Sequence, residues 1–221
     1  MLAKDLISDI VPALHTSDTG QKALNWMDVF RVSHLPIIND KEFLGLISDT
    51  DIYDMNMADE PIGNHKLSLF SPFIYMDQHI YEVIEIVARL KLTVVPVLDR
   101  QKNYLGMITN HDLVQYFAGL TAVKNPGAIL VLELHQNDYF LSQIAQIVES
   151  NDAKILSLYI QPHDDSTKME VILKVNRTDV TSIISTFERY DYNVKASYMN
   201  NREMESFYAS RYDEFMMYLS I

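Results

Sequence analysis

The chain has 221 residues, 48% of them hydrophobic and 22% charged, which is the composition of an ordinary globular protein. The net charge is −12, and both halves are acidic: residues 1–121 carry 9 basic and 16 acidic side chains, and residues 122–221 carry 9 and 14. This balance argues against nucleic acid or an anionic membrane as the main partner. Cysteine is absent, which excludes disulfides, thiolate nucleophiles and cysteine metal sites.

The first ten residues, MLAKDLISDI, lack the long apolar core of a signal peptide. No run approaches the roughly 18 apolar residues of a membrane span. We therefore expect a cytoplasmic protein that does not bind a membrane.

One phrase occurs twice in the first half. LGLISDTD (44–51) matches LGMITNHD (105–112), and HLPIIND (34–40) matches VVPVLDR (94–100). The match extends over about fifty residues per copy, in one order, so the sequence predicts a fold unit that is built twice.

Each copy has the same predicted order of elements. A short extended segment precedes a helix with apolar residues at helical spacing, for which Asp18 and Asp77 are the predicted N-caps. Two strands separated by a polar turn follow, and a second helix begins at the end of the phrase. The strands are expected at 35–38 and 43–47 in the first copy and at 93–98 and 104–108 in the second.

This pattern resembles the CBS domain, named after cystathionine β-synthase. It consists of apolar-Pro-apolar-apolar, a turn, and Leu-Gly-apolar-apolar-Ser/Thr-x-x-Asp, and it occurs in both copies. The resemblance covers roughly residues 1–121 and implies a tandem pair that packs as one unit, with repeats at 1–60 and 61–121. It also implies a homodimer, because such pairs commonly dimerise.

A Ser or Thr at a strand end, followed by Asp at a helix start, places a hydroxyl beside a carboxylate. A carboxylate can accept hydrogen bonds from both hydroxyls of a ribose, and the nearby glycine allows close approach of the backbone. By the resemblance, the ribose contacts of two adenosine-binding clefts would be Ser48 with Asp51 and Thr109 with Asp112. The walls of the base pockets would be His34, Leu35, Pro36, Val94, Val95 and Pro96.

We call Ser48 with Asp51 the first corner and Thr109 with Asp112 the second corner. The charges beside these two corners differ. Asp49 and Asp54 crowd the first corner, which favours a ligand with little negative charge, whereas Asn110 and His111 mark the second as the neighbourhood for a phosphate. AMP, ATP or S-adenosylmethionine would be suitable ligands, and no cofactor is required. The same Ser/Thr-x-x-Asp pattern also caps a helix without any ligand, so both interpretations stay open.

The sequence predicts no catalytic residue and no metal site. Asp49 and Asp51 resemble the D-x-D opening of haloacid-dehalogenase-type phosphatases, but no Gly is followed by the Asp that their Mg²⁺ site usually includes. A calcium loop from Asp49 would have Asp54 where the sharp turn needs Gly. The histidines lack metal-ligand spacing, so the chain is not expected to be an enzyme.

The second half has a different pattern. Residues 122–127 contain Pro126 and Gly127 and are predicted to be a linker. Residues 128–200 predict strand–helix–strand–strand–helix–strand, the ferredoxin-like βαββαβ order. This order resembles the ACT domain, a small-molecule sensing module often specific for amino acids. Tyr139 stands where that family usually has Gly, and its bulk would obstruct backbone contact with such a ligand.

Residues 201–221 are predicted to form a C-terminal amphipathic helix. Apolar residues recur there at helical spacing, and the segment has only two Arg against four acidic residues, so packing on the ACT-like sheet or on a second subunit is favoured over a membrane. The stripe consists of Met204, Tyr208, Tyr212, Phe215 and Leu219.

The predicted architecture resembles the bacterial CBS–ACT proteins of the acetoin-utilisation type. We expect a non-catalytic regulatory protein that binds an adenosine-containing ligand and passes its occupancy to the ACT-like domain or to a protein target through a population shift. The alternative is a dimeric interaction scaffold whose clefts stay empty.

Overall fold

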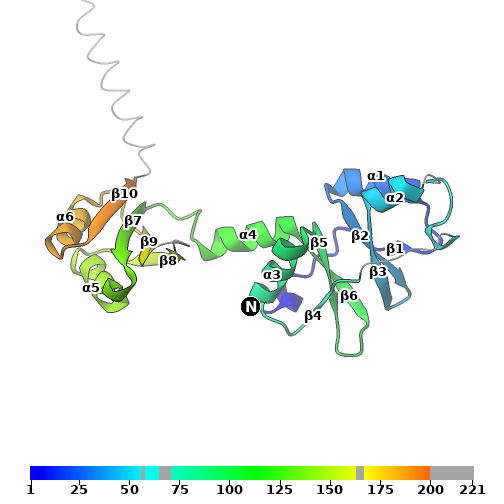
Figure 1. Cartoon of the computed structure of the whole chain (residues 1–221), viewed down its shortest axis with the longest axis horizontal. Coiled ribbons are helices and arrows are strands. Elements are labelled where there is room, and N and C mark those ends of the chain that lie inside the picture. The colour runs from blue at the N-terminus through cyan, green and yellow to red at the C-terminus, as the bar shows by residue number, and fades with distance from the viewer. Residues whose placement is uncertain (56–57, 65–70, 163–166, 200–221) are drawn as a thin grey trace, which may run out of the picture. The chain divides into compact units, whose positions relative to one another are not determined.

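The computed structural model describes residues 1–55, 58–64, 71–162 and 167–199. The chain divides into two compact units, Met1–Tyr116 and Phe117–Ile221, each with its own hydrophobic core (Figure 1). No helix within these described ranges has the length and apolar character needed to cross a lipid bilayer. The predicted C-terminal helix at 201–221 lies outside the described residues.

The first unit contains one arrangement twice. A short strand runs parallel to a second strand, which pairs antiparallel with a third; one helix lies between the first two strands in the chain, and another follows the third. The first copy comprises β1 (Leu14–His15), α1 (Gly20–Phe30), β2 (His34–Asn39), β3 (Glu42–Ser48) and α2 (Asp49–Met55). The second comprises β4 (Ile74–Tyr75), α3 (Ile80–Leu90), β5 (Val94–Leu98), β6 (Tyr104–Thr109) and α4 (Asn110–Leu120).

The first helix of each copy begins later than predicted. Thr19 caps α1 by accepting the backbone N–H of Lys22 (3.2 Å), and His79 caps α3. The predicted caps were therefore wrong. The carboxylate of Asp18 instead binds the ammonium of Lys22 (2.6 Å), and Asp77 lies two residues before the true cap.

The segment that precedes each copy packs on the other copy. Residues 1–9 include η1 (Ala3–Leu6), and the N–H of Ala3 donates to the carbonyl of Gln78 in the second copy (2.9 Å). In the same way η2 (Ile62–Asn64) packs on the first copy, where the N–H of Ile62 donates to the carbonyl of Asp18 (2.8 Å). The two copies therefore exchange their leading segments.

The glycine of the second phrase is required by this exchange. Gly106 has φ +147°, and a Cβ there would lie 2.4 Å from Cγ2 of Ile7. From the sequence, this glycine is expected to allow close approach to a ligand. In the structure its missing side chain leaves space for the N-terminal segment, and the N–H of Ser8 donates to the carbonyl of Met107 next to it (2.9 Å).

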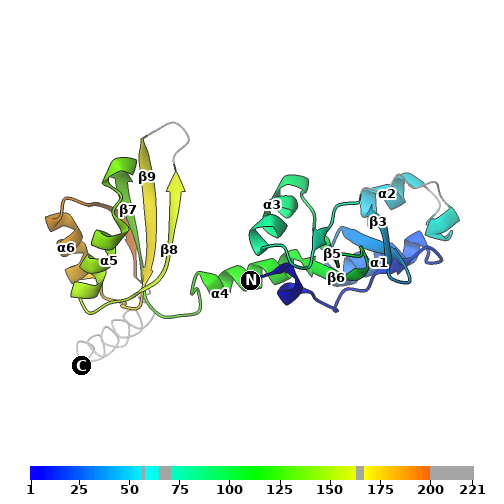
Figure 2. The same cartoon turned by 90° about the horizontal axis from the view of Figure 1, so that it is seen from below.

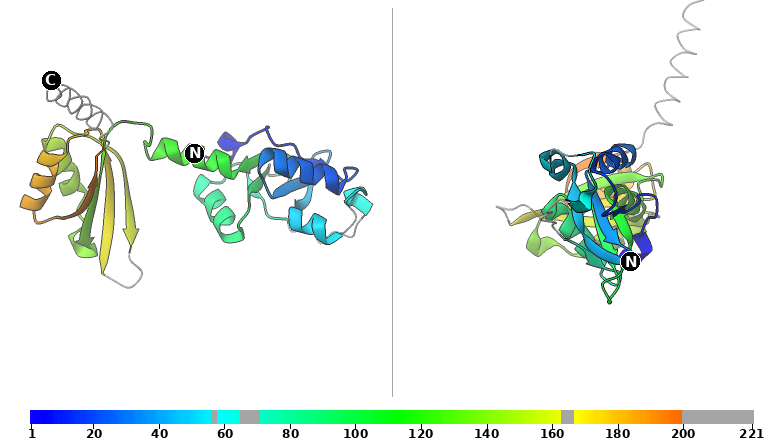
Figure 3. Two further views of the ribbon diagram at one scale, coloured as in Figure 1. Left: turned by 90° about the horizontal axis from the view of Figure 1, so that it is seen from above. Right: turned by 90° about the vertical axis from the view of Figure 1, so that its right-hand side faces the viewer.

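The second unit has the predicted βαββαβ order. Its four strands form an antiparallel sheet in the order β10-β7-β9-β8, and α5 and α6 lie on one face of this sheet (Figures 2 and 3). The likeness to the ACT domain stays a prediction, because unrelated families share this order. The elements are β7 (Ala128–His135), η3 (Gln136–Asp138), α5 (Leu141–Ser150), β8 (Ile155–Pro162), β9 (Lys168–Val175), α6 (Thr181–Arg189) and β10 (Asn193–Tyr198).

The core of the second unit lies between the sheet and the two helices. Alternate residues of β7 and β9, such as Leu130, Leu132 and Leu173, are fully buried there. Tyr139 packs against the same core, which anchors the β7–α5 loop. Gly127 begins the unit with φ +147°, where a Cβ would lie only 1.9 Å from the carbonyl oxygen of Val175.

Candidate functional site

The corner of the second copy joins the end of β6 to the first turn of α4. The hydroxyl of Thr109 donates to Oδ2 of Asp112 (2.6 Å), and the backbone N–H of Thr109 donates to the same oxygen (2.9 Å). In return, the N–H of Asp112 donates to the hydroxyl oxygen of Thr109 (3.2 Å). Thr109 is only 7% exposed, so this part of the corner is close to fully buried.

The corner of the first copy has the same three bonds. The hydroxyl and the N–H of Ser48 donate to Oδ2 of Asp51 (2.7 and 2.8 Å), and the N–H of Asp51 donates to the hydroxyl oxygen of Ser48 (3.1 Å). Here Ser48 is half-buried and Asp51 is exposed. The repeated phrase therefore builds the same hydrogen-bonded corner twice, in a more open form in the first copy.

Each corner is a helix cap that uses only part of its carboxylate. The three bonds satisfy a backbone donor at the start of the following helix, as the cap interpretation requires. They engage Oδ2 alone; within the described ranges no hydrogen bond is made to Oδ1 of Asp51 or of Asp112. One carboxylate oxygen per corner thus remains able to accept from a ligand.

Of the six residues predicted to line the base pockets, only His34 has an accessible side chain, and the other five are buried. In the strand register, His34 lies opposite Ser48 and Val94 lies opposite Thr109, so each is beside its corner. His34 is half-buried, whereas the others belong to the hydrophobic interior of the first unit and do not line an open surface. The buried members are Leu35, Pro36, Val94, Val95 and Pro96.

His34 connects the two copies through Thr93. Its Nδ1 lies 3.1 Å from the hydroxyl oxygen of Thr93, which also accepts the N–H of Ser33 (2.9 Å). Thr93 was assigned to a strand but was not predicted as a site residue. The sequence contained a signal that could have identified Thr93. Ser33 and Thr93 are 60 residues apart, and each immediately precedes the equivalent strand of its repeat.

The surroundings of His34 favour the neutral form of its imidazole. Burial lowers its pKa from 6.5, while the nearby carboxylates of Asp49 and Asp51 oppose that shift. A neutral imidazole has one nitrogen donor and one acceptor, and one nitrogen is engaged with Thr93. The other nitrogen is the polar group that this side chain could offer to a ligand at the first corner.

The first residues of α2 and α4 give the two corners different charges. Asn110 and His111 open α4 and are both exposed, with no acidic residue before Asp112. At the equivalent position α2 opens with Asp49, whose Oδ1 accepts the N–H of Thr50 (2.7 Å). The difference in charge predicted from the sequence is therefore located at the corners themselves.

The second unit has a cavity of about 520 Å³ at the end of β7. Carboxylates and aromatic rings line it, but Tyr139, expected to obstruct a ligand in this loop, is not among the lining residues because it packs on the core. The carboxylates are those of Glu133, Asp138 and Asp191, and the rings are those of Phe140, Tyr190 and Tyr192. In the part of the chain that the structure describes, no cluster of three or more His, Asp or Glu could hold a metal ion.

Comparison with known families addresses the first unit. Residues 3–58 and 67–119 match the family model of the CBS domain. The chain contains a CBS domain pair. Each match contains one complete corner, Ser48 with Asp51 in the first CBS domain and Thr109 with Asp112 in the second.

Several solved structures are similar to about half of this chain. A CBS domain pair/ACT domain protein from Thermotoga maritima is 20% identical over 53% of this chain and 96% of that chain, with a TM-score of 0.47. A putative acetoin utilization protein from Vibrio cholerae is 19% identical over 56% and 95%, with a TM-score of 0.49. CBSX2 in complex with AMP is 16% identical over 56% and 98%, with a TM-score of 0.46.

Proposed function

We propose that this chain is a non-catalytic regulatory protein whose CBS pair binds an adenosine-containing ligand. The proposal rests on the carboxylate of each corner, which uses only Oδ2 for the helix cap. Because Oδ2 of Asp112 completes the cap, Oδ1 is left to accept from a ribose hydroxyl without any loss of the helix cap. The same holds for Asp51, so the pair offers two such positions.

The charges favour different ligands at the two corners. A phosphate fits the second corner better, because Asn110 and His111 add polar donors without a further carboxylate. A ligand whose ribose carries no phosphate fits the first corner, where Asp49 would repel one. AMP and ATP are therefore proposed for the second corner, and S-adenosylmethionine for the first.

The occupancy of the second corner has a covalent route to the rest of the chain. Asp112 lies in the first turn of α4, and the same helix ends at Leu120 in the second unit. A ligand that favours one position of α4 would shift the population of states on the other side of it. We propose that an ACT-like second unit or a protein target receives this signal, in a cytoplasmic homodimer.

Thermal unfolding of ligand-stripped protein tests the proposal. AMP, ATP, S-adenosylmethionine and 5′-methylthioadenosine are the probes, with GMP as the control for base recognition. At a hundredfold excess over the dissociation constant, a ligand stabilises the folded state by about 2.7 kcal/mol, which is a measurable rise in melting temperature. No rise with any adenosine probe would contradict the proposal.

The substitution Asp112→Asn tests the assigned atom. Asn keeps one oxygen for the cap but presents an amide donor where the ribose needs an acceptor. Hydrogen bonds to charged groups contribute about 1.5–3 kcal/mol, so we expect AMP to bind at least about tenfold more weakly. Asp28→Asn removes the same charge from an exposed position of α1 and should leave AMP binding unchanged.

The second candidate function is a dimeric interaction scaffold with empty clefts. The observation that favours it is the complete burial of Leu35, Val94 and Val95, which leaves these predicted base-pocket side chains inaccessible. A scaffold predicts no response to the nucleotide panel and a dimer mass, measured by light scattering, that is the same with and without nucleotides.

A further inference from the structure

The face of the sheet opposite α5 and α6, called here the open face, has an apolar row across all four strands of the second unit. Side chains alternate along each strand, so the neighbours of core residues such as Leu130 and Leu173 point to this face. The strand register aligns the row directly, since paired residues share a face. The row consists of Tyr159, Ile172, Val131 and Ala196.

The open face is apolar at one end and ionic at the other. Beyond the apolar row lie two ion pairs, Lys168 with Glu133 (2.8 Å) and Lys195 with Glu170. On the opposite side of the row, the next set of paired residues brings Ile129 and Tyr198 to the face, together with one cation. That cation is Lys174, which forms no ion pair within the described ranges.

The apolar end is hollowed and incompletely covered. A cavity of about 440 Å³ opens there, and its lining includes Ile129, Ile172 and Lys174. Large apolar side chains at its rim remain exposed to solvent, Tyr159 by 50% and Tyr198 by 62%. A contiguous exposed apolar surface of this kind marks an interaction site.

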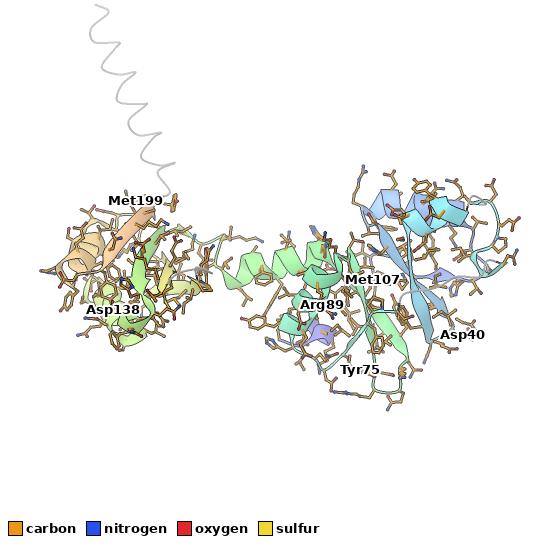
Figure 4. The ribbon with its side chains drawn as sticks, in the orientation of Figure 1. Asp40, Tyr75, Arg89, Met107, Asp138 and Met199 are labelled. Atoms are coloured by element: carbon orange, nitrogen blue, oxygen red, sulfur yellow. The ribbon has the colours of Figure 1, made fainter. Side chains whose placement is uncertain are left out.

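The chain leaves the sheet at the rim of this cavity. Met199, which follows β10, lines the cavity and is 41% exposed (Figure 4). The next 22 residues, 200–221, contain the stripe of apolar residues at helical spacing described in the sequence analysis. Because residues 200–221 are tethered at the rim, their effective concentration near the cavity is about a millimolar or more. A free partner would have to be present at the same concentration to compete equally.

The dimensions and charges of this segment fit the open face. If residues 204–212 are helical, their stripe extends about 12 Å, and the sheet of four strands is about 14 Å wide. Residues 200–203 are available for the turn between β10 and such a helix. The segment has four acidic and two basic residues, which complements the lone Lys174 at the apolar end.

We propose that residues 200–221 fold back as a helix and pack their apolar stripe into the hollow at the apolar end of the open face, within the same chain. This interaction buries Tyr159 and Tyr198 and places an acidic flank of the helix beside Lys174. It defines a surface of the second unit that does not depend on any ligand of the CBS pair.

Engineered disulfides test the proposal directly, because the natural chain has no cysteine. The full-length double variant Tyr159→Cys/Tyr208→Cys joins the apolar row to the stripe. We expect an intrachain disulfide, seen as a faster-migrating monomer on non-reducing gels and as one cross-linked peptide by mass spectrometry. The matched control Tyr159→Cys/Ser210→Cys uses a residue on the other side of the predicted helix and should cross-link at least about tenfold more slowly.

Each other outcome overturns the proposal. Cross-linked dimers in which Tyr159→Cys is joined to Tyr208→Cys of another chain would show an exchanged tail. Dimers formed by the single variant Tyr159→Cys would show a second copy seated on the open face. Equal rates for the two double variants, or no cross-link, would show a tail that does not dock.

A second measurement does not rely on cysteine chemistry. Met204→Asp/Tyr208→Asp places two charges in the stripe, and we expect the variant to bind a hydrophobic dye more strongly and to expose Tyr159 to chemical iodination. Glu203→Asp/Ser210→Asp changes the polar side of the same segment and should behave as the natural chain. Unchanged dye binding and iodination in the first variant would contradict the proposal.

Discussion

At the scale of single residues, His34 shows how the interface between the CBS domains sets a side chain's properties. The imidazole contacts Thr93 of the other CBS domain, and burial lowers its pKa while Asp49 and Asp51 oppose the shift. Protonation would add a charge to a half-buried group whose nitrogen already has a partner. The protonation of His34 therefore links the pH of the solution to the interface between the two CBS domains.

The stability of the chain should depend on pH through His34. Its folded pKa lies below the unfolded value of 6.5, so below that pH the unfolded state binds more protons and the free energy of unfolding falls as pH falls. Urea unfolding at about pH 8 and about pH 5 should show a smaller loss in His34→Gln than in the natural chain. Equal losses in His34→Gln and in the natural chain would contradict the assignment.

At the scale of elements, the exchange of leading segments determines the glycine of the second phrase. The sequence predicted the repeat, its strands and its second helices, because these depend on local period and on residues spaced about 60 apart. It did not predict that Ile7 occupies the space above Gly106, since a contact between distant segments leaves no local pattern. The caps of α1 and α3 were misplaced because Asp18 binds Lys22 and Asp77 binds Arg100, and neither caps its helix.

Gly106→Ala should destabilise the CBS pair by about 2–4 kcal/mol, because it combines an unfavourable positive φ with a steric clash. Ile7→Ala removes the clashing group, so the double variant should be at least about 0.5 kcal/mol more stable than the two single losses predict together. Urea unfolding measures all three. Gly119→Ala, in α4 with nothing near its added methyl group, should instead stabilise by about 0.5–1 kcal/mol.

The candidate site could be predicted only in part. The corner residues come from one short phrase, so their spacing along the chain was enough to bring Thr109 and Asp112 together. The burial of Leu35 and Val95 was not evident, because an apolar strand can face either a ligand or a core. The cavities of the second unit depend on how side chains of several strands meet, which no linear pattern contains.

At the scale of the whole molecule, the chain has two hydrophobic cores with no shared member. The buried cluster of the first unit ends at Leu113, and that of the second begins at Ala128. Each core also depends on a glycine that no other residue can replace without strain, Gly106 in the first and Gly127 in the second. A substitution in one core is therefore expected to act within its own unit.

Gly106→Ala and Gly127→Ala should therefore act independently. A methyl group at Gly127 would meet a backbone carbonyl at 1.9 Å, so we expect a loss of about 3 kcal/mol confined to the second unit. In the double variant the two losses should add to within about 0.5 kcal/mol. Hydrogen exchange followed by mass spectrometry assigns each loss to its unit, and protection lost in both units from one substitution would contradict this independence.

The exchanged leading segment also has a consequence for synthesis. Residue 8 pairs with residue 107, so the first segment leaves the ribosome long before its partner strand exists. At about 5–20 residues per second, the 98 residues between them take roughly 5–20 s to translate. During that interval the N-terminal segment has no partner, because the second copy on which it packs has not yet been made. The N-terminal segment can therefore take its place in the CBS pair only after the second copy has been synthesised.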